Sequence, residues 1–266
     1  MSAPLNRFKA ALAARQRQFG LWLGLANPYT AEICAGAGFD WLVIDGEHAP
    51  NDLPRMLEQL QALAGHDVAP VVRVPIGETW LIKQVLDLGA QTVLVPMVES
   101  AAQARELVRA MRYPPEGVRG VGAALARASN FNRAPGYLGG ANAQVCLLVQ
   151  VESRAGLAAI EEIAALDGVD GIFIGPADLA ADMGHLANPG AAEVKAAVLD
   201  GIARIARAGC APGILTGDRA FVHECLDAGA VFVAVGSDVG LLSAASSALA
   251  AAFRQGASGA RAEGSY

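Results

Sequence analysis

The sequence predicts an α/β fold, a single (β/α)8 TIM barrel in which parallel strands alternate with helices. Short apolar runs alternate along the chain with segments of helical periodicity. The apolar runs are bounded by Gly, Pro or acidic residues, as is typical of strands buried on both faces. The length of 266 residues is also normal for one barrel of this kind.

An open, doubly wound sheet is the alternative architecture for the same alternation of elements. The first apolar run is not followed by a GxGxxG motif, and the chain has no Walker A pattern. Both observations argue against nucleotide binding and favour the closed barrel.

The strands are expected where the apolar runs are short and rich in Val, Ile, Leu and Phe. In chain order we place them at residues 19–25, 41–45, 70–74, 92–96, 145–152, 171–175, 212–215 and 232–236. The intervening segments have helical periodicity, most clearly at residues 53–64, 79–89 and 99–112. Pro114 and Pro115 stop the last of these helices, because proline cannot continue a helical hydrogen-bond ladder.

The ends of the chain and one long insertion depart from this alternation. A basic amphipathic segment at residues 1–18 predicts an N-terminal helix. Residues 113–143 are polar and Gly-rich, and loops of this length are typically functional lids or disordered. No linker divides residues 1–253, so we expect one domain there. Residues 254–266 are rich in Gly, Ala and Ser and predict a flexible tail.

Composition excludes several classes of partner. The net charge is −6 and no cluster of Lys or Arg appears, which argues against binding to nucleic acid or an anionic membrane. No apolar run is long enough for a membrane span, and the N-terminus lacks the apolar core of a secretory signal. We therefore expect a cytoplasmic protein. The four cysteines form no CxxC motif, so we expect them to be free.

Acidic residues follow two consecutive predicted strands. Active sites of barrels form at the C-terminal ends of the strands, where Glu152 and Asp178 would converge. Two carboxylates without nearby His or Cys favour Mg²⁺ or Mn²⁺ over zinc. As alternatives, Asp178 would cap the following helix, and Glu152 would be an acid in the first turn of its own helix.

A second polar cluster follows the predicted strand at 41–45. Asp45 ends that strand, and His48 comes three residues later, where the two side chains would form a pair for acid–base catalysis. The alternative for His48 is a hydrogen bond to a backbone carbonyl. Arg73 lies in the next predicted strand. A buried guanidinium needs a partner, either a carboxylate of the chain or an anionic substrate.

A divalent metal, a base and an arginine together favour chemistry through an enolate. Aldolases that use a Schiff base instead need a lysine at the barrel mouth. The three lysines, Lys9, Lys83 and Lys195, all fall in segments of helical periodicity. Their placement disfavours the Schiff-base route.

Several motifs are similar to those of a known family. DGEHAPND and FIGPADLAADMG form a specific combination, and PVVRV, LVQVES and YPPEGVRGVGAALARAS accompany them. Together they resemble the HpcH/HpaI aldolase family over about residues 7–253. The resemblance implies a class II pyruvate aldolase that reversibly cleaves 4-hydroxy-2-oxo acids, such as 4-hydroxy-2-oxoheptanedioate, to pyruvate and an aldehyde such as succinate semialdehyde. It also implies a divalent cofactor: Mg²⁺, Mn²⁺ or Co²⁺.

Three other functions remain open at this point. A related aldolase would act on 2-keto-3-deoxy sugar acids, and a lyase of the same superfamily would act on CoA thioesters. A CoA enzyme needs a basic nucleotide-binding surface, which the sequence does not show. A non-catalytic barrel that binds sugar acids is a third possibility, against which the combination of acids, histidine and arginine argues.

The resemblance implies roles for individual residues. Glu152 and Asp178 match the metal ligands, and Arg73 matches the arginine that contacts the keto oxygen. His48 matches the base, and Asp45 matches the acid that orients it. Other positions match as follows: Glu47 an acid beside the site, Asp87 an acid that reaches the histidine of a neighbouring subunit, and the substrate-binding residues Gln150, Gly175, Pro176, Ala177, Trp22 and Leu215.

Relatives of this kind assemble as hexamers, trimers of dimers that exchange their final helix. The apolar segment at residues 238–254 is consistent with such a helix. A helix that caps its own barrel would show the same pattern. The resemblance therefore implies a homohexamer that the sequence pattern alone does not establish.

Overall fold

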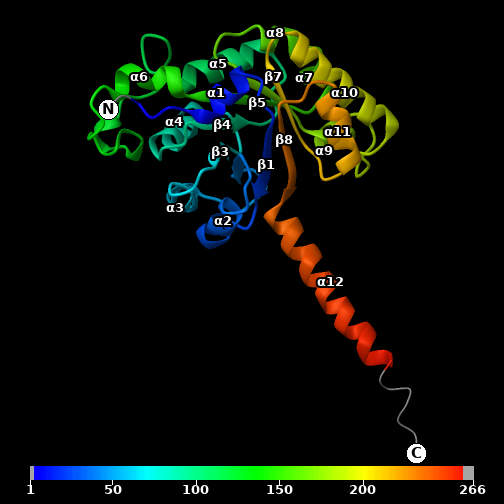
Figure 1. Ribbon diagram of the computed structural model, residues 1–266. Helices are drawn as coiled ribbons and strands as arrows, with labels where there is room; N and C mark the ends of the chain where they lie inside the picture. Colours follow the sequence, from blue (N-terminus) through cyan, green and yellow to red (C-terminus); the bar gives the residue numbers. More distant parts are fainter. Residues whose placement is uncertain (1–2, 260–266) are drawn as a thin grey trace, which may run out of the picture.

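The computed structural model describes residues 3–259 and shows a closed barrel of eight parallel strands in chain order (Figure 1). The prediction of a closed barrel is confirmed, and the open sheet is excluded because β8 pairs with β1. The strands are β1 (Gln18–Leu23), β2 (Trp41–Asp45), β3 (Ala69–Arg73), β4 (Thr92–Val95), β5 (Cys146–Val151), β6 (Gly171–Ile174), β7 (Ala211–Leu215) and β8 (Phe232–Ser237).

Helices surround the barrel on its outer face. Polar side chains start several of them: Asp52 accepts the N–H of Arg55 at α3, and Ser100 accepts that of Gln103 at α5. The helices are α1 (Arg7–Ala13), α2 (Pro28–Ala35), α3 (Leu53–Leu63), α4 (Thr79–Asp87), α5 (Ala101–Met111), α6 (Tyr137–Gln144), α7 (Arg154–Ala158), α8 (Ile160–Ala164), α9 (Pro176–Asp182), α10 (Ala192–Arg207), α11 (Arg219–Asp227) and α12 (Asp238–Gly259).

The interior of the barrel is filled by aromatic rings. Trp22, Trp41, Phe173 and Phe232 come from four different strands and pack edge-on or tilted, with centroids 5.4–6.2 Å apart. Phe8 of α1 packs on Trp41 from the end at which the strands begin. The rings and α1 close that end, so the opposite end, the barrel mouth, is where polar side chains gather.

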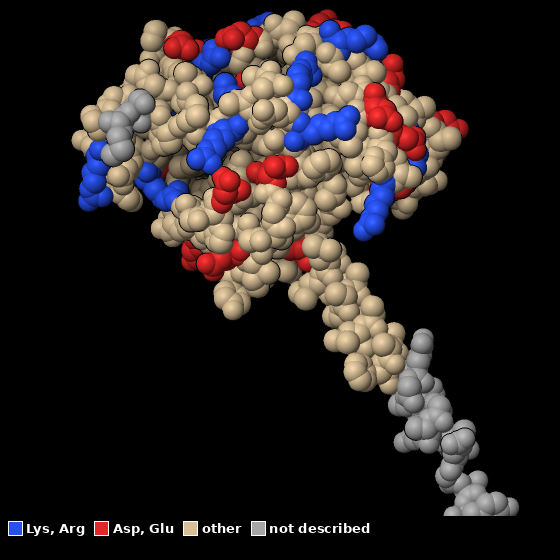
Figure 2. Space-filling model, in the orientation of Figure 1, with Lys and Arg blue, Asp and Glu red and all other residues tan. Residues whose placement is uncertain are grey.

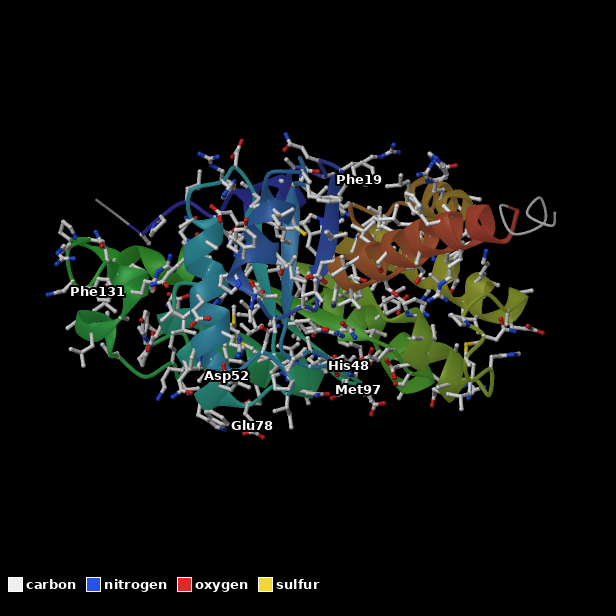
Figure 3. All side chains as sticks on the ribbon, turned by 90° about the horizontal axis from the view of Figure 1, so that it is seen from below. Phe19, His48, Asp52, Glu78, Met97 and Phe131 are labelled. Atoms are coloured by element: carbon white, nitrogen blue, oxygen red, sulfur yellow. The ribbon has the colours of Figure 1, made fainter. Side chains whose placement is uncertain are left out.

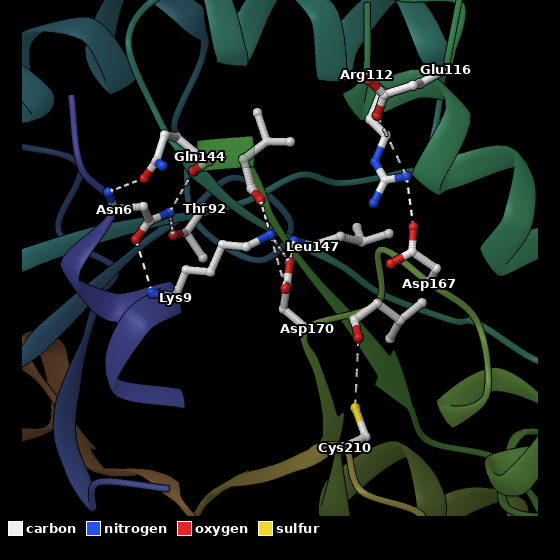
Figure 4. Close-up of polar contacts among 12 residues, drawn as sticks. Asn6, Lys9, Thr92, Arg112, Glu116, Gln144, Leu147, Asp167, Asp170 and Cys210 are labelled. Carbon is white, nitrogen blue, oxygen red and sulfur yellow. Dashed lines mark hydrogen bonds and ion pairs between the residues drawn. The ribbon is translucent and has the colours of Figure 1, made fainter. Parts of the chain in front are cut away.

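Polar contacts fasten α1 to the closed end (Figure 4). The Lys9 ammonium pairs with Asp170 at 3.0 Å and donates to the carbonyl of Val145. The side-chain oxygen of Asn6 accepts the N–H of Lys9, and its amide donates to Thr92 at 3.0 Å. Lys9 therefore has a structural role far from the mouth.

The insertion at 113–143 is ordered by short helices. It contains the 3₁₀ turns η1 (Ala123–Leu125) and η2 (Arg127–Ser129) before α6. Arg127 donates to the carbonyl of Leu88, the C-cap of α4, at 2.9 Å and to that of Leu60, in the last turn of α3, at 3.3 Å. A cation suits helix C-termini, so Arg127 fixes the insertion to the outer ring of helices.

The last helix projects away from the barrel (Figure 1). At its start, Asp238 accepts the backbone N–H groups of Gly24 and Leu25, at 2.7 and 3.1 Å. Farther along, Leu242, Leu249 and Phe253 are 58%, 63% and 77% exposed. In Figure 2, the face in view of the part of this helix that is drawn in tan shows no charged side chains. The barrel of the same chain therefore leaves these apolar side chains uncovered.

Residues 254–259 of the expected tail belong to α12. The remaining tail residues, 260–266, lie outside the described part of the chain. Among the helices of residues 3–259, none combines the length and apolar character that crossing a bilayer requires. All four cysteines are free.

Candidate active site

The polar residues of the mouth come from the C-terminal ends of β2, β3, β5 and β6. Asp45 and Arg73 are the last residues of β2 and β3, and they are paired in register. Glu152 directly follows β5, and Gly175 directly follows β6. Figure 3 labels His48, Asp52, Glu78 and Met97 at this edge of the molecule, opposite Phe19 near the start of β1. The residues predicted from separate motifs are thus brought to one end of the barrel.

Arg73 forms a buried ion-pair cluster with two acids. Its Nε and Nη2 donate to the two carboxylate oxygens of Asp45 at 2.8 and 2.6 Å, and its Nη1 lies 2.6 Å from Glu47 Oε2. The guanidinium carbon also lies 5.2 Å from the centre of the Trp22 ring. The two-pronged contact with Asp45 fixes the plane of the guanidinium. Each Nη carries a second N–H that these contacts leave available.

These contacts set the charges of both acids. Burial opposes ionisation of Asp45, but the hydrogen bonds and charge of Arg73 outweigh it and lower the pKa of Asp45. For Glu47, burial raises the pKa, and the charges of Asp45 and Asp178 add to that effect against those of Arg73 and His48. The two carboxylates that contact Arg73 therefore differ, because the pKa of Asp45 is lowered and the pKa of Glu47 is raised.

The position of His48 differs from the expected pairing. The Asp45 carboxylate accepts the backbone N–H of Glu47 at 3.0 Å and that of His48 at 3.4 Å, and does not contact the imidazole. The ring Nε2 instead lies 3.8 Å from Glu47 Oε2, and the side chain is 65% exposed. Asp45 thus holds the backbone that carries His48, while Glu47 is the acid beside the ring. Spacing along the chain did not reveal this, because Arg73 on the neighbouring strand takes the Asp45 carboxylate.

Glu152 is a buried carboxylate held by two donors. Its Oε1 accepts the backbone N–H of Met97 at 2.8 Å, and its Oε2 accepts the amide of Gln150 at 2.5 Å. A Cβ on Gly175 would run into the same carboxylate, so this glycine makes room for it. Burial raises the pKa of Glu152 despite these hydrogen bonds, and the charges of Asp178 and Glu47 raise it further.

Asp178 lies in the first turn of α9 and is not its cap. Gly175 occupies the N-cap position, and no side chain caps the helix. Within residues 3–259, neither a hydrogen bond nor an ion pair engages the Asp178 carboxylate. The capping alternative is therefore wrong, and the carboxylate remains available at the mouth.

The donor set fits a hard divalent cation. The negative charge of Asp178 opposes ionisation of Glu152 at the mouth. A cation bound by both carboxylates would reduce the free-energy cost of keeping them ionised. Gln150 Oε1 is also buried without a hydrogen-bond partner among the described residues. In that part of the chain, no group of three or more His, Cys, Asp or Glu side chains is arranged around a common point. Water and substrate would therefore supply the remaining ligands, as is usual for Mg²⁺ and Mn²⁺.

The other predicted residues have different surroundings. Trp22 packs in the interior cluster of the barrel, and Leu215 at the end of β7 packs against that cluster. Pro176 and Ala177 begin α9 directly after Gly175. Asp87 ends α4 and pairs with the buried Arg119 at 2.7 Å, away from the mouth of its own barrel.

The lysines lie where the sequence placed them, on helices. Lys9 is on α1 at the closed end, Lys83 is on α4, and Lys195 on α10 pairs with Asp218 at 3.1 Å. None of them follows the C-terminal end of a strand. The placement that disfavours a Schiff-base route is therefore confirmed.

Met97 is a residue of the site that sequence reasoning missed. It contributes its backbone N–H to Glu152, and nothing about a methionine in the run VPMVES indicates such a role. The local feature that distinguishes Met97 is its φ of 55°, which the structure shows and the residue type does not.

Known proteins are similar to this chain over most of its length. The model of the family described as HpcH/HpaI aldolase/citrate lyase matches residues 18–245. A hydroxypyruvate/pyruvate aldolase of Deinococcus radiodurans is 62% identical over 249 residues, which cover 94% of this chain and 90% of that protein. A 4-hydroxy-2-oxo-heptane-1,7-dioate aldolase of Klebsiella pneumoniae is 56% identical over 252 residues, 95% of each chain.

A solved structure is similar over nearly the whole chain. It is that of a HpcH/HpaI aldolase/citrate lyase family protein from Burkholderia cenocepacia, with a TM-score of 0.90 and 42% sequence identity. The match covers 94% of this chain and 99% of that one. The similarity therefore includes the barrel and the loops at its mouth.

Proposed function

Because the chain belongs to the HpcH/HpaI aldolase/citrate lyase family, we propose that it is a metal-dependent pyruvate aldolase. It is a carbon–carbon lyase that reversibly cleaves 4-hydroxy-2-oxo acids to pyruvate and an aldehyde. The observation that carries this proposal is the pair of carboxylates, Glu152 and Asp178, at the same end of the barrel as Arg73 and His48. Names of relatives at 54–62% identity support the same reaction class.

The substrate would lie across the mouth with its keto acid end toward β6. At the start of α9, Gly175 already donates its N–H to the Val151 carbonyl at 3.0 Å, and Pro176 has no N–H. Of these three residues, Ala177 therefore has the backbone N–H that would donate to the substrate carboxylate. The available N–H groups of Arg73 would donate to the keto oxygen. Trp22 and Leu215 would line the space for the aldehyde portion, since both belong to the apolar cluster below the mouth.

Cleavage requires a base at the C4 hydroxyl and stabilisation of the charge that moves to the keto oxygen. His48 Nε2 takes the hydroxyl proton, the C4–O bond becomes the aldehyde carbonyl, and the electrons of the C3–C4 bond form the pyruvate enolate. Arg73 donates hydrogen bonds to the enolate oxygen, where they are stronger than in the ground state. A divalent cation held by Glu152 and Asp178 would supply Lewis acidity to that oxygen. Return of the proton to C3 gives pyruvate.

Glu47 serves both partners in this scheme. Its carboxylate lies 2.6 Å from Arg73 Nη1 and 3.8 Å from the His48 ring. It would stabilise the imidazolium that forms when His48 accepts the proton. The pairing of Asp45 with Arg73 keeps the guanidinium in place throughout.

The experiment is release of pyruvate, coupled to lactate dehydrogenase, from a panel of 4-hydroxy-2-oxo acids that includes 4-hydroxy-2-oxoheptanedioate. Aldol addition with pyruvate or hydroxypyruvate as donor runs alongside, because relatives are named for both. We expect cleavage in the panel with Mg²⁺, Mn²⁺ or Co²⁺ present. Activity confined to 2-keto-3-deoxy sugar acids would identify the related aldolase instead. Activity only on CoA thioesters, or none at all, would overturn the proposal.

We further infer that α12 packs against a second copy of the chain in a homohexamer, a trimer of dimers. Its exposed leucines and Phe253 support this, because an apolar helix in solvent is stable only when covered. Asp87 would then reach the histidine of a neighbouring subunit, whereas in its own subunit its carboxylate pairs with Arg119 at 2.7 Å.

Charge placed on α12 is expected to dissociate the assembly. The double substitution Leu242→Asp and Leu249→Asp buries two unpaired carboxylates in any interface that α12 forms, which costs several kcal/mol. We expect a lower mass by light scattering after size exclusion. The matched control is Leu186→Asp, since Leu186 is 80% exposed and lies outside α12. An unchanged mass of the double variant would show that α12 does not hold the copies together.

A further inference from the structure

Met97 has a backbone conformation that its side chain does not explain. It lies two residues beyond β4 with a φ of 55°, in the left-handed region that non-glycine residues seldom adopt. Met97 is 51% exposed, so burial of its side chain offsets little of the free-energy cost of this backbone conformation. Some function of the backbone must therefore hold it there.

The backbone N–H of Met97 leaves the sheet to reach Glu152. Val95 is the last residue of β4 in register with β5, opposite Val149. Backbone hydrogen bonding between the two segments resumes at Val98, whose N–H donates to the Gln150 carbonyl at 2.9 Å. Between these points, Pro96 and Met97 lie outside the pairing of β4 with β5, and the Met97 N–H donates to Glu152 Oε1 at 2.8 Å.

A side chain of α5 holds the turn in this shape. Gln103 donates from its amide to the Met97 carbonyl at 3.2 Å and accepts the N–H of Glu99 at 3.0 Å. Glu99 in turn accepts from the hydroxyl of Ser153 at 2.6 Å, next to Glu152. The turn is thus fastened on one side to α5 and on the other to the segment that carries the carboxylate.

We propose that Met97 is a positioning residue for the metal centre. Its left-handed backbone directs one N–H at Glu152 Oε1 and fixes the rotation of that carboxylate, while Gln150 holds the other oxygen. The ligand thus meets the cation in a single orientation. Partners that orient metal ligands in this way typically change affinity about 10–100-fold when they are removed. The inference rests on the proposed role of Glu152 as a metal ligand.

Two substitutions of Met97 separate its backbone from its side chain. Met97→Gly removes the side chain but retains the N–H and adopts positive φ without strain. Met97→Val retains the N–H and much of the apolar character, but a β-branched residue disfavours this region strongly. Phe131→Val is the matched control, because Phe131 is also left-handed, with φ of 55°, also exposed, and distant from His48 and Met97 in Figure 3.

The measurement is the dissociation constant for Mn²⁺ of the metal-free protein, read from the EPR signal of free Mn²⁺. We expect Met97→Val to weaken binding about 10–100-fold, and Met97→Gly and Phe131→Val to stay within about twofold of the parent. Unchanged affinity in Met97→Val would overturn the proposal. Equal weakening in Met97→Gly and Met97→Val would also overturn it, since the side chain would then be what matters.

Two further variants keep the test decisive. Gln103→Ala removes the amide that holds the turn and is expected to weaken Mn²⁺ binding in the same direction, even if Met97→Val fails to fold. Glu152→Gln tests the assumption beneath the inference and should remove most of the affinity. Full affinity in Glu152→Gln would refute the metal assignment itself. Loss in Glu152→Gln without loss in Met97→Val or Gln103→Ala would refute only the role of Met97.

Discussion

Replacing His48 by alanine is expected to lower the turnover number for aldol cleavage by about 10²–10⁴-fold, the usual contribution of a general base. The ring is the group at the mouth suited to accept the C4 hydroxyl proton, because the nearby carboxylates of Asp45 and Glu47 are engaged by Arg73. Its exposed side chain supports no core packing, so folding should be unaffected.

Binding and stability must stay constant for this result to identify a base. We expect the Mn²⁺ dissociation constant and the melting temperature of His48→Ala to match those of the parent. His223→Ala is the control, since His223 is exposed on α11 and far along the chain from the mouth loops. Cleavage by His48→Ala at the parental rate would contradict the assignment of the base.

Replacing Arg73 by lysine is expected to lower the turnover number by about 10²–10³-fold, the cost of removing a donor aimed at a developing oxyanion. Lysine retains the positive charge but lacks the planar fork that binds both oxygens of Asp45 and still presents N–H groups to substrate. The loss should appear in the turnover number more than in the Michaelis constant, because the interaction strengthens as the enolate forms.

Truncation of the same residue should have a second, larger effect on folding. Arg73→Ala leaves Asp45 and Glu47 buried without their counter-ion, and breaking a buried pair in this way costs about 3–5 kcal/mol. We expect its melting temperature to fall well below that of Arg73→Lys in a calorimetric scan. The exposed pair of Arg109 with Glu106 provides the control, because Arg109→Ala should change stability by less than about 1 kcal/mol. Parental turnover in Arg73→Lys would exclude a role in stabilising the enolate.

The strands of this fold could be placed from sequence because each is short, apolar and buried on both faces. Trp41–Asp45 was located to the residue, and Ala69–Arg73 begins one residue earlier than the expected range at 70–74. The barrel architecture then predicts that Glu152 and Asp178 lie at the same end, and this prediction needs no information on side-chain contacts. Residues at strand ends are thus the part of the site that pattern alone locates.

Contacts between strands were beyond that reasoning. The spacing of Asp45 and His48 suggested a pair, but β2 and β3 place Arg73 opposite Asp45, and a guanidinium competes for the carboxylate more strongly than an imidazole. The direction of α12 was open for a related reason. An apolar helix has the same pattern whether it covers its own barrel or another. The φ of Met97 leaves no mark on the residue type at all.

We expect aldol cleavage by this protein to depend on a divalent cation at Glu152 and Asp178. Pyruvate release from 4-hydroxy-2-oxoheptanedioate by the purified protein, before and after removal of metal with EDTA, tests it most directly. We predict that cleavage falls to background without metal and returns when Mn²⁺, Mg²⁺ or Co²⁺ is added, and that Asp178→Asn is not restored. Full cleavage in EDTA, with inactivation by borohydride in the presence of pyruvate, would instead demonstrate a lysine Schiff base and exclude a metal-dependent reaction.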